Sequence, residues 1–378
     1  MKRQLLGVAA FMLALSAHAQ DNPLWMRYCA ISPDGTSIAF TYKGDIYTVP
    51  VNGGKAAQIT TNAAHDTHPV WSPDGKQIAF ASDRMGSMDI FVVDREGGIP
   101  KRLTTHSGNE TPVAFKDADH ILFLANVMPS AEDAQFPSGQ FQQVYEVSTT
   151  GDRPVMFSSM PMEDISINKT GNALLYHDKK GYEDPWRKHH TSSITRDIWL
   201  CSLDGKRSYR KLTSFNGEDR TPVWASDGKS FYYLSEEKGS FNVFKRALDG
   251  TTSTQLTHHT KHPVRFLTAA DNGTLCYGYD GEIYTMKEGT EPRKVQISIL
   301  TDKNDKDLIR QIRRNGATEI ALSPDAKEVA FILRGDVYVT SVEYKTTKQI
   351  TNTPEQERDI NFAPDGRSIV YALSLIHI

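Results

Sequence analysis

Short apolar runs, separated by polar turns, recur along most of the chain. Four of these runs follow polar turns of four residues, and the turns begin at Ser32, Ser72, Ser323 and Ala363. The first two turns lie 40 residues apart, and so do the last two. Apolar runs of three to five residues bounded by Pro, Asp and Gly are typical of β-strands. The pattern therefore predicts strands in a fixed repeat.

Each complete repeat contains four predicted strands. The first ends at the polar turn, and the second is the apolar run after it, such as Ile38–Phe40. The third carries an acidic or amide residue before aliphatic and aromatic ones, as in Asp45–Tyr47, and the fourth ends in a Leu-Thr or Ile-Thr pair. Four strands in a period of this size are the signature of a β-propeller blade. Because the acidic residue recurs in blade after blade, we expect it to form structural hydrogen bonds.

The turn that joins the first two strands is Ser-Pro-Asp-Gly in its full form. Proline presets φ for a type I turn, aspartate caps the turn, and glycine takes the left-handed position that follows. Ala326 replaces this glycine in one repeat. A left-handed alanine costs about 1 kcal/mol, so this turn is expected to be either strained or differently shaped.

The repeats also divide the chain. We expect an all-β fold with a six-bladed β-propeller of four-stranded blades over residues 20–296, and a charged linker over 297–316. Residues 317–378 then form the first one and a half blades of a second propeller. Because the eighth repeat stops after its second strand, we expect the chain to be a fragment of a longer protein. Two repeats carry long insertions, 125–141 and 178–195, and loops of this kind often determine specificity.

The first nineteen residues have the pattern of a secretory signal peptide. Lys2 and Arg3 precede an apolar stretch, Leu5–Leu15, and Ala17-His18-Ala19 has the small-x-small pattern of a cleavage site. We therefore expect cleavage after Ala19 and a periplasmic or otherwise exported protein. Nowhere else does the sequence stay apolar for the ~18 residues that a spanning helix needs, so no membrane anchor is predicted.

Composition adds little to this picture. The chain is 39% hydrophobic and 24% charged, which is ordinary for a folded soluble protein. A formal net charge of -3 gives no indication of a nucleic-acid partner. Cys29, Cys201 and Cys276 lie within apolar strand patterns and have no zinc or redox spacing, so we expect buried, unpaired thiols.

The ordered set of segments, with the break after six blades, resembles the N-terminal part of the tricorn-type proteases in their exported bacterial branch. The segments that carry the resemblance are Pro23–Tyr28, Ile31–Gly35, Tyr42–Tyr47, Phe331–Tyr338 and Gln349–Gly366. The resemblance implies a six-bladed propeller, a seven-bladed propeller, and a catalytic region that holds a PDZ module, a serine nucleophile and its histidine. No position here matches those catalytic motifs, so none is assigned in this chain.

By this resemblance the parent protein is a periplasmic serine peptidase that degrades peptides or unfolded proteins, with this part as scaffold and peptide gate. The resemblance also allows a homo-oligomer formed through the full-length protein. Two alternatives stay open. One is a non-enzymatic TolB-like propeller that binds envelope proteins, although its propeller would follow a small mixed domain. The other is the propeller of a prolyl-peptidase-type enzyme, whose remainder would be an α/β-hydrolase domain.

The sequence offers no other convincing chemistry. A G-x-S-x-G nucleophile elbow is absent, and turn formation explains the serines of the polar turns. The carboxylates of 302–307 alternate but lack the glycine and distal glutamate of a calcium loop. His258 and His259 would point to opposite faces of a strand. We therefore predict no cofactor and no metal site.

The residues just before each first strand are the remaining candidates. First strands surround the central channel of a propeller, so the positions where they begin should ring one mouth of that channel. From these positions we select a mixed-charge, peptide-binding rim made of His68, Glu110, Arg220 and His262. The alternative interpretation is the ordinary polarity of surface loops.

Overall fold

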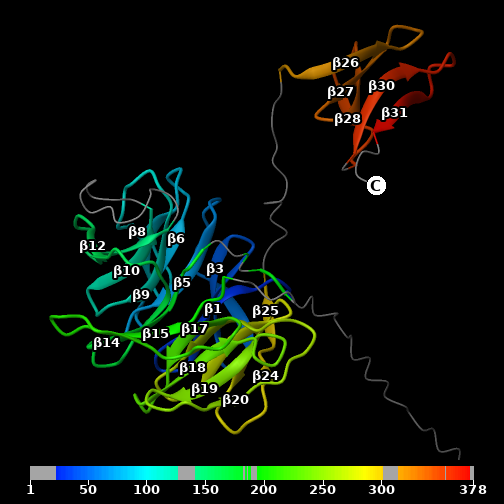
Figure 1. The fold of residues 1–378 in the computed structure, drawn as a ribbon. Coiled ribbons are helices and arrows are strands. Elements are labelled where there is room, and N and C mark those ends of the chain that lie inside the picture. Colours follow the sequence, from blue (N-terminus) through cyan, green and yellow to red (C-terminus); the bar gives the residue numbers. More distant parts are fainter. Residues whose placement is uncertain are drawn as a thin grey trace, which may run out of the picture. The chain divides into compact units, whose positions relative to one another are not determined.

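The computed structural model describes residues 23–126, 141–181, 184, 186–188, 194–300, 314–353 and 355–374 (Figure 1). The predicted signal peptide, 1–19, and most of the first insertion, 127–140, lie outside these residues. The chain divides into two compact units, residues 1–302 and 303–378. The described residues form strands and turns but no helix, so they include no helix that is long and apolar enough to cross a membrane.

The first unit contains six sheets, each with four consecutive antiparallel strands, and in the first sheet a fifth strand from the end of the unit pairs with the fourth. Within a sheet the chain runs from the innermost to the outermost strand, so each sheet is one blade. The blades are β1 (Arg27–Ile31), β2 (Ser37–Tyr42), β3 (Asp45–Pro50), β4 (Gly54–Gln58); β5 (Asp66–Trp71), β6 (Gln77–Ser82), β7 (Asp89–Asp94), β8 (Lys101–Arg102); β9 (Glu110–Phe115), β10 (His120–Ala125), β11 (Gln143–Ser148), β12 (Val155–Ser158); β13 (Met162–Ile167), β14 (Ala173–Asp178), β15 (Ile198–Ser202), β16 (Tyr209–Lys211); β17 (Asp219–Trp224), β18 (Ser230–Ser235), β19 (Asn242–Ala247), β20 (Ser253–Gln255); and β21 (Arg265–Ala269), β22 (Leu275–Tyr279), β23 (Glu282–Met286), β24 (Arg293–Lys294).

The innermost strands close into a ring. Strand β1 contacts β5, and the contacts continue through β9, β13 and β17 to β21, which contacts β1 again. The sheets are therefore arranged in a ring, which is the unit coloured blue to yellow in Figure 1. The predicted all-β propeller fold is confirmed.

Apolar cores lie between neighbouring blades. Ala39 of the first blade packs with Ile78 and Phe80 of the second, and Ala79 of the second packs with Ile121 and other residues of the third. Both alanines are fully buried. A methyl side chain at these positions lets two sheets approach closely, which explains why the apolar runs contain alanine between bulky residues.

The recurring polar residues form hydrogen bonds and ion pairs between the third and fourth strands of a blade. The hydroxyl of the Leu-Thr or Ile-Thr pair accepts the amide of a third-strand residue, as in Ile46 N–Thr60 Oγ1 at 2.9 Å. The acidic residue before that amide pairs across to the fourth strand, as in Asp89–Arg102 at 2.8 Å. Both contacts recur in other blades. The recurring acids therefore have the structural role that their repetition predicts.

The alanine-containing turn keeps the shape of its glycine counterparts. Ala326 has φ +57°, close to +71° at Gly35 and +69° at Gly366. Its amide donates to the Ser323 carbonyl at 2.8 Å, as the Gly35 amide donates to Ser32 at 2.8 Å. Of the two expectations for this turn, strain is the one that the structure supports, because an L-residue here is in the left-handed region.

The end of the first unit differs from the prediction. Residues 297–299, expected at the start of the linker, form β25 (Ile297–Ile299), which pairs in parallel with β4 at the outer edge of the first blade. Ile297 is only 3% exposed and packs in the core shared by the first and sixth blades. The alternation of Val295, Ile297 and Ile299 carries the strand past the predicted boundary. A Cβ on Gly53 would lie 2.5 Å from the Gln296 carbonyl oxygen, so this close approach requires glycine.

The second unit is smaller. Its four-stranded sheet consists of β26 (Ala317–Leu322), β27 (Glu328–Leu333), β28 (Asp336–Ser341) and β29 (Thr347–Gln349), and a hairpin follows, β30 (Gln356–Phe362) and β31 (Ile369–Ser374). The hairpin packs on the sheet through a core that contains Ile332, Val337 and Ile360. Residues 301–313 of the predicted linker and residues 375–378 lie outside the described part of the chain.

Candidate functional site

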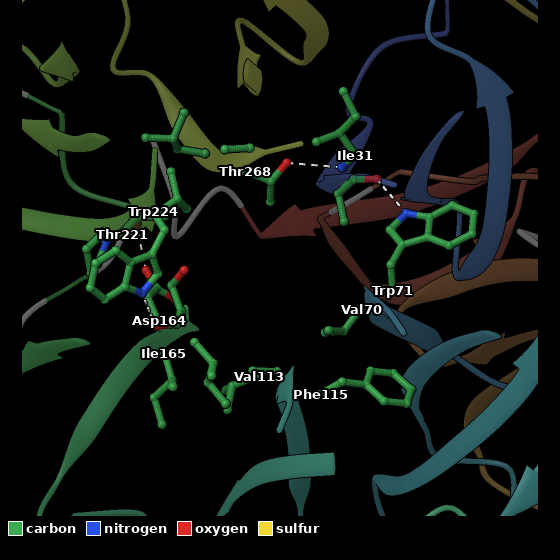
Figure 2. A pocket seen from close by; sticks show the side chains of 18 of the residues that line it. Ile31, Val70, Trp71, Val113, Phe115, Asp164, Ile165, Thr221, Trp224 and Thr268 are labelled. Carbon is green, nitrogen blue, oxygen red and sulfur yellow. Dashed lines mark hydrogen bonds between the residues drawn. The ribbon is translucent and has the colours of Figure 1, made fainter. Parts of the chain in front are cut away.

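The central channel of the first unit forms a large cavity. Its volume is about 1060 Å³, and the innermost strands of all six blades line it. Away from its mouth the wall is mostly apolar, and Figure 2 shows several of these side chains around the open space, among them Ile31, Val70, Val113, Phe115 and Ile165. A wall of this kind favours apolar groups because they leave water when they enter.

Side chains in the channel wall tie neighbouring blades together. The Trp71 indole donates to the Ala30 carbonyl of the preceding blade at 2.9 Å, and Trp224 donates to Ser166 at the same distance. The Thr268 hydroxyl accepts the Ile31 amide at 3.1 Å across the joint between the last and first blades. Figure 2 shows the bonds of Trp71 and Thr268 on the channel wall. These contacts hold the wall in place.

All six innermost strands of the first unit shift register at the same position, four residues before the end-of-strand turn. In five of them the residue at this position has a left-handed backbone, with φ between +49° and +56°. In β9 the position is Pro112, whose ring holds φ near −65°. A bulge redirects side chains, and all five residues line the channel. We call them the bulge ring: Tyr28, His68, Asp164, Thr221 and Phe266.

One side of the bulge ring is aromatic. The rings of His68 and Tyr28 lie 3.7 Å apart between centroids, and those of Tyr28 and Phe266 lie 4.9 Å apart. Burial lowers the pKa of His68 to about 4, so its imidazole is neutral at neutral pH. This side therefore presents a largely uncharged, stackable surface to a ligand.

The other side of the bulge ring is ionic. Asp164 accepts the Thr221 hydroxyl at 2.6 Å, and its carboxylate lies 3.6 Å from Nδ1 of His177. Glu163 lies 3.2 Å from Nε2 of the same histidine and 2.6 Å from the Lys179 ammonium. Burial alone would raise the pKa of Glu163, but the hydrogen bonds and charges of His177 and Lys179 outweigh it and lower that pKa. The carboxylate is thus held ionised.

Part of the second insertion is fixed at this mouth. We call its residues 184 and 186–188 the mouth strap. The Arg187 side chain is fully buried and bonds to Glu236 of the fifth blade at 2.8 Å and to Glu218 at 3.0 Å. Arg196 bonds to Glu218 as well, at 2.8 Å. Two arginines and two glutamates thereby attach an insertion of the fourth blade to the fifth.

The same strap reaches the sixth and first blades through Trp186. The Arg265 guanidinium donates to the Trp186 carbonyl at 2.8 Å and lies 4.9 Å from the centroid of its indole ring. Arg27 of the first blade lies 4.7 Å from the same centroid, and Phe266 lies 6.0 Å away. Trp186 lines the channel while 40% of it stays exposed. It is therefore a side chain that anything entering by this mouth would meet.

Comparison with known proteins assigns this architecture to a family. The family model described as "Tricorn protease N-terminal beta propeller domain" matches residues 23–292. The chain belongs to this family. Its resemblance to the tricorn-type proteases is thereby confirmed for the propeller portion.

The chain is also similar to individual tricorn proteases. The chain is 25% identical over 339 residues to tricorn protease homolog 1 of Streptomyces coelicolor, covering 88% of this chain and 30% of that protein. It is 25% identical over 332 residues to the tricorn protease of Thermoplasma acidophilum, covering 84% and 29%. The crystal structure of the tricorn protease superposes with a TM-score of 0.67 at 18% identity, over 90% of this chain and 33% of that one. The chain thus spans about a third of these relatives.

Of the four rim residues predicted from the sequence, two line the channel of this tricorn-type propeller and two do not. His68 and Arg220 line the channel, whereas Glu110 and His262 are not among the lining residues. Arg220 is 7% exposed, lies 4.0 Å from the centroid of the Phe241 ring, and has its pKa lowered to about 10 by burial. Arg220 therefore lies in the channel wall with most of its side chain covered.

The other two residues take part in other contacts. Glu110 is 2% exposed and accepts the hydroxyl of Thr104 from the preceding blade, because it lies at the start of β9, away from the bulge position. Burial raises its pKa to about 7. His262 lies 3.2 Å from Asp280 of the sixth blade and 3.5 Å from Lys188 of the mouth strap. Glu110 and His262 therefore lie outside the set of residues that line the channel, and peptide binding by the four rim residues stays a prediction.

The rim prediction left out most residues of the mouth. Tyr28, Thr221 and Phe266 are not glycine, so their left-handed backbone has no sequence signature. The aromatic and basic composition of 178–195 could have pointed to Trp186, but not to its contacts with distant blades. Among the described residues, no group of three or more His, Cys, Asp or Glu side chains could hold a metal ion.

Proposed function

We propose that this propeller is the peptide gate of an exported, tricorn-like serine peptidase. The central channel accepts extended peptides or unfolded protein segments, and the bulge ring with the mouth strap determines what enters. In this proposal, hydrolysis belongs to parts of the parent protein that this chain does not include. The observation that carries the proposal is the apolar channel with Trp186 fixed at its mouth.

The chemistry of the channel favours peptides over other polymers. Apolar walls suit the side chains of an unfolded segment, and a cavity of this size is in the range that holds small ligands and short peptides. The ionic side of the mouth, with Asp164 and Glu163, provides acceptors for backbone amides. A nucleic acid would instead need a basic surface, and the net charge of the chain is -3. Export with cleavage after Ala19 is part of the same proposal.

A binding experiment with one protein in two states tests the proposal. The probe is fluorescently labelled α-lactalbumin, either reduced and carboxymethylated so that it is unfolded, or native. The full chain is titrated with each form, and fluorescence anisotropy gives the dissociation constant. The proposal expects binding of the unfolded form, with native α-lactalbumin binding at least roughly tenfold more weakly.

Two variants locate the binding surface. Val113→Trp narrows the channel, whereas Ile99→Trp adds the same side chain at a position that is 98% exposed and does not line the cavity. We expect Val113→Trp to weaken binding of the unfolded probe roughly tenfold and Ile99→Trp to leave it unchanged. Thermal melts of both variants check that the fold persists. Equal binding by both variants would favour the TolB-like alternative, in which partners bind an outer surface.

A further inference from the structure

Two cysteine thiols meet at the joint between the last and first blades of the propeller. Cys29 lies on β1, and its Sγ is 3.5 Å from the Phe266 carbonyl oxygen of the sixth blade. Cys276 lies on β22 of that blade, and β1 packs directly against β22. Both are free thiols, 2% and 0% exposed, in one apolar core.

The backbone on both sides of this thiol pair is fixed by contacts between the blades. Thr268 is the register partner of Cys276, and its hydroxyl accepts the Ile31 amide at 3.1 Å. The Met26 amide donates to the Gly281 carbonyl at 3.0 Å across the same joint. The two strands therefore cannot slide past one another without breaking these bonds, and the thiols stay opposed.

The remaining cysteine is far from this joint. Cys201 lies on β15 of the fourth blade and packs in a different core, with Met162 and Tyr176. The sequence holds three cysteines in all, so Cys29 and Cys276 have one plausible partner each. Cys29 and Cys276 are 247 residues apart in the sequence (276 − 29), so no local pattern reveals the pairing, and sequence analysis predicts unpaired thiols.

We propose that Cys29 and Cys276 form a disulfide that covalently closes the propeller ring. The two thiols give up two protons and two electrons to a disulfide oxidant, which is reduced to two thiols as the new sulfur–sulfur bond forms. The bond joins the first and sixth blades, which no loop of the ring connects, and it restricts the unfolded chain over 247 residues (276 − 29). This inference does not depend on the peptide-gate function.

The bond has to form before the joint is fully closed. Burial raises the pKa of the Cys276 thiol well above its usual range, so little of the reactive thiolate exists in the closed ring. An oxidant also cannot reach side chains that are this deeply buried. Oxidation during folding, or during transient opening of the joint, avoids both obstacles.

Peptide mapping of the full chain tests the proposal. Protein produced with reduced thiols is unfolded in urea, returned to native buffer containing a mixture of oxidised and reduced glutathione, and then alkylated and digested with trypsin without reductant. Cleavage isolates the three cysteines in peptides 28–43, 197–206 and 266–287. We expect 28–43 linked to 266–287, with Cys201 alkylated or carrying glutathione. Circular dichroism checks that the refolded protein has regained its β-structure.

Stability gives a second readout. Reduction of the linked protein should lower its melting temperature by roughly 5–10 °C, and the variant Cys29→Ser/Cys276→Ser should show no such dependence on reductant. Cys201→Ser is the matched control and should behave as the parent chain. Well-folded protein in which Cys29 and Cys276 are alkylated or bound to glutathione, with no linked peptide, would overturn the proposal.

Discussion

Glu110 shows how one residue links burial to a measurable pH dependence. Its pKa is raised to about 7 by burial, whereas an unfolded glutamate titrates near ~4.3. Between these values the unfolded chain loses its proton first, so the stability present at low pH declines as pH rises towards 7. Above that pH the carboxylate is charged in both states and the penalty is constant.

The variant Glu110→Gln removes this titration. Its amide oxygen still accepts the Thr104 hydroxyl, so the main contact of the side chain is kept. We expect the variant to be more stable than the parent by about 1–3 kcal/mol at pH 8 and nearly equal at pH 4. Urea unfolding at both pH values measures this. The control Glu96→Gln, at a side chain that is 87% exposed, should show no such difference. If Glu110→Gln destabilised the protein equally at both pH values, Glu110 would be ionised in the fold.

At the scale of the element, local patterns predict the blades and miss the mouth. The polar turns, the acidic third strands and the Leu-Thr pairs are local signals, and each corresponds to a hydrogen bond seen in the structure. The bulge ring has no such signal, because left-handed residues such as His68 and Thr221 are ordinary in composition. The strap depends on Arg187 meeting Glu218 and Glu236, contacts between distant segments that no local pattern encodes.

The mouth strap yields its own prediction, which rests on the proposed gate. Trp186→Ala removes the indole between Arg27 and Arg265 but keeps the backbone carbonyl that Arg265 binds. We expect unfolded, labelled α-lactalbumin to associate several-fold faster with this variant in stopped-flow anisotropy. The melting temperature should change little, because Trp186 is 40% exposed and Arg187 stays paired.

Trp25→Ala is the matched control for the strap. Trp25 is 70% exposed and also contacts Arg27, at 5.8 Å, but it is not among the residues that line the channel. Loss of this tryptophan should leave the association rate unchanged. An equal increase in both variants would show that any exposed tryptophan near Arg27 slows the probe, and would remove Trp186 from the gate.

At the scale of the whole molecule, a ring of blades is weakest where the chain does not pass from one blade to the next. In this propeller that joint lies between the sixth and first blades, and β25 crosses it by pairing with β4. Ile297 supplies the apolar contact in the shared core. Replacing it with alanine should destabilise the unit by about 2–4 kcal/mol, through lost burial and the cavity that remains.

The blades in which Ile297→Ala lowers protection from hydrogen exchange show whether Ile297 closes the ring or only packs in a local core. In Ile297→Ala, hydrogen exchange should speed up together in the first and sixth blades, at β4 and at β22 to β24, because the joint opens as a unit. Ile121→Ala is the control, a fully buried isoleucine between the second and third blades, and its effect should stay within those two blades. Faster exchange confined to 297–299 in Ile297→Ala would mean that β25 only covers the edge of the first blade. The ring would then be closed by the contacts of β1 with β21 and β22, with or without the disulfide.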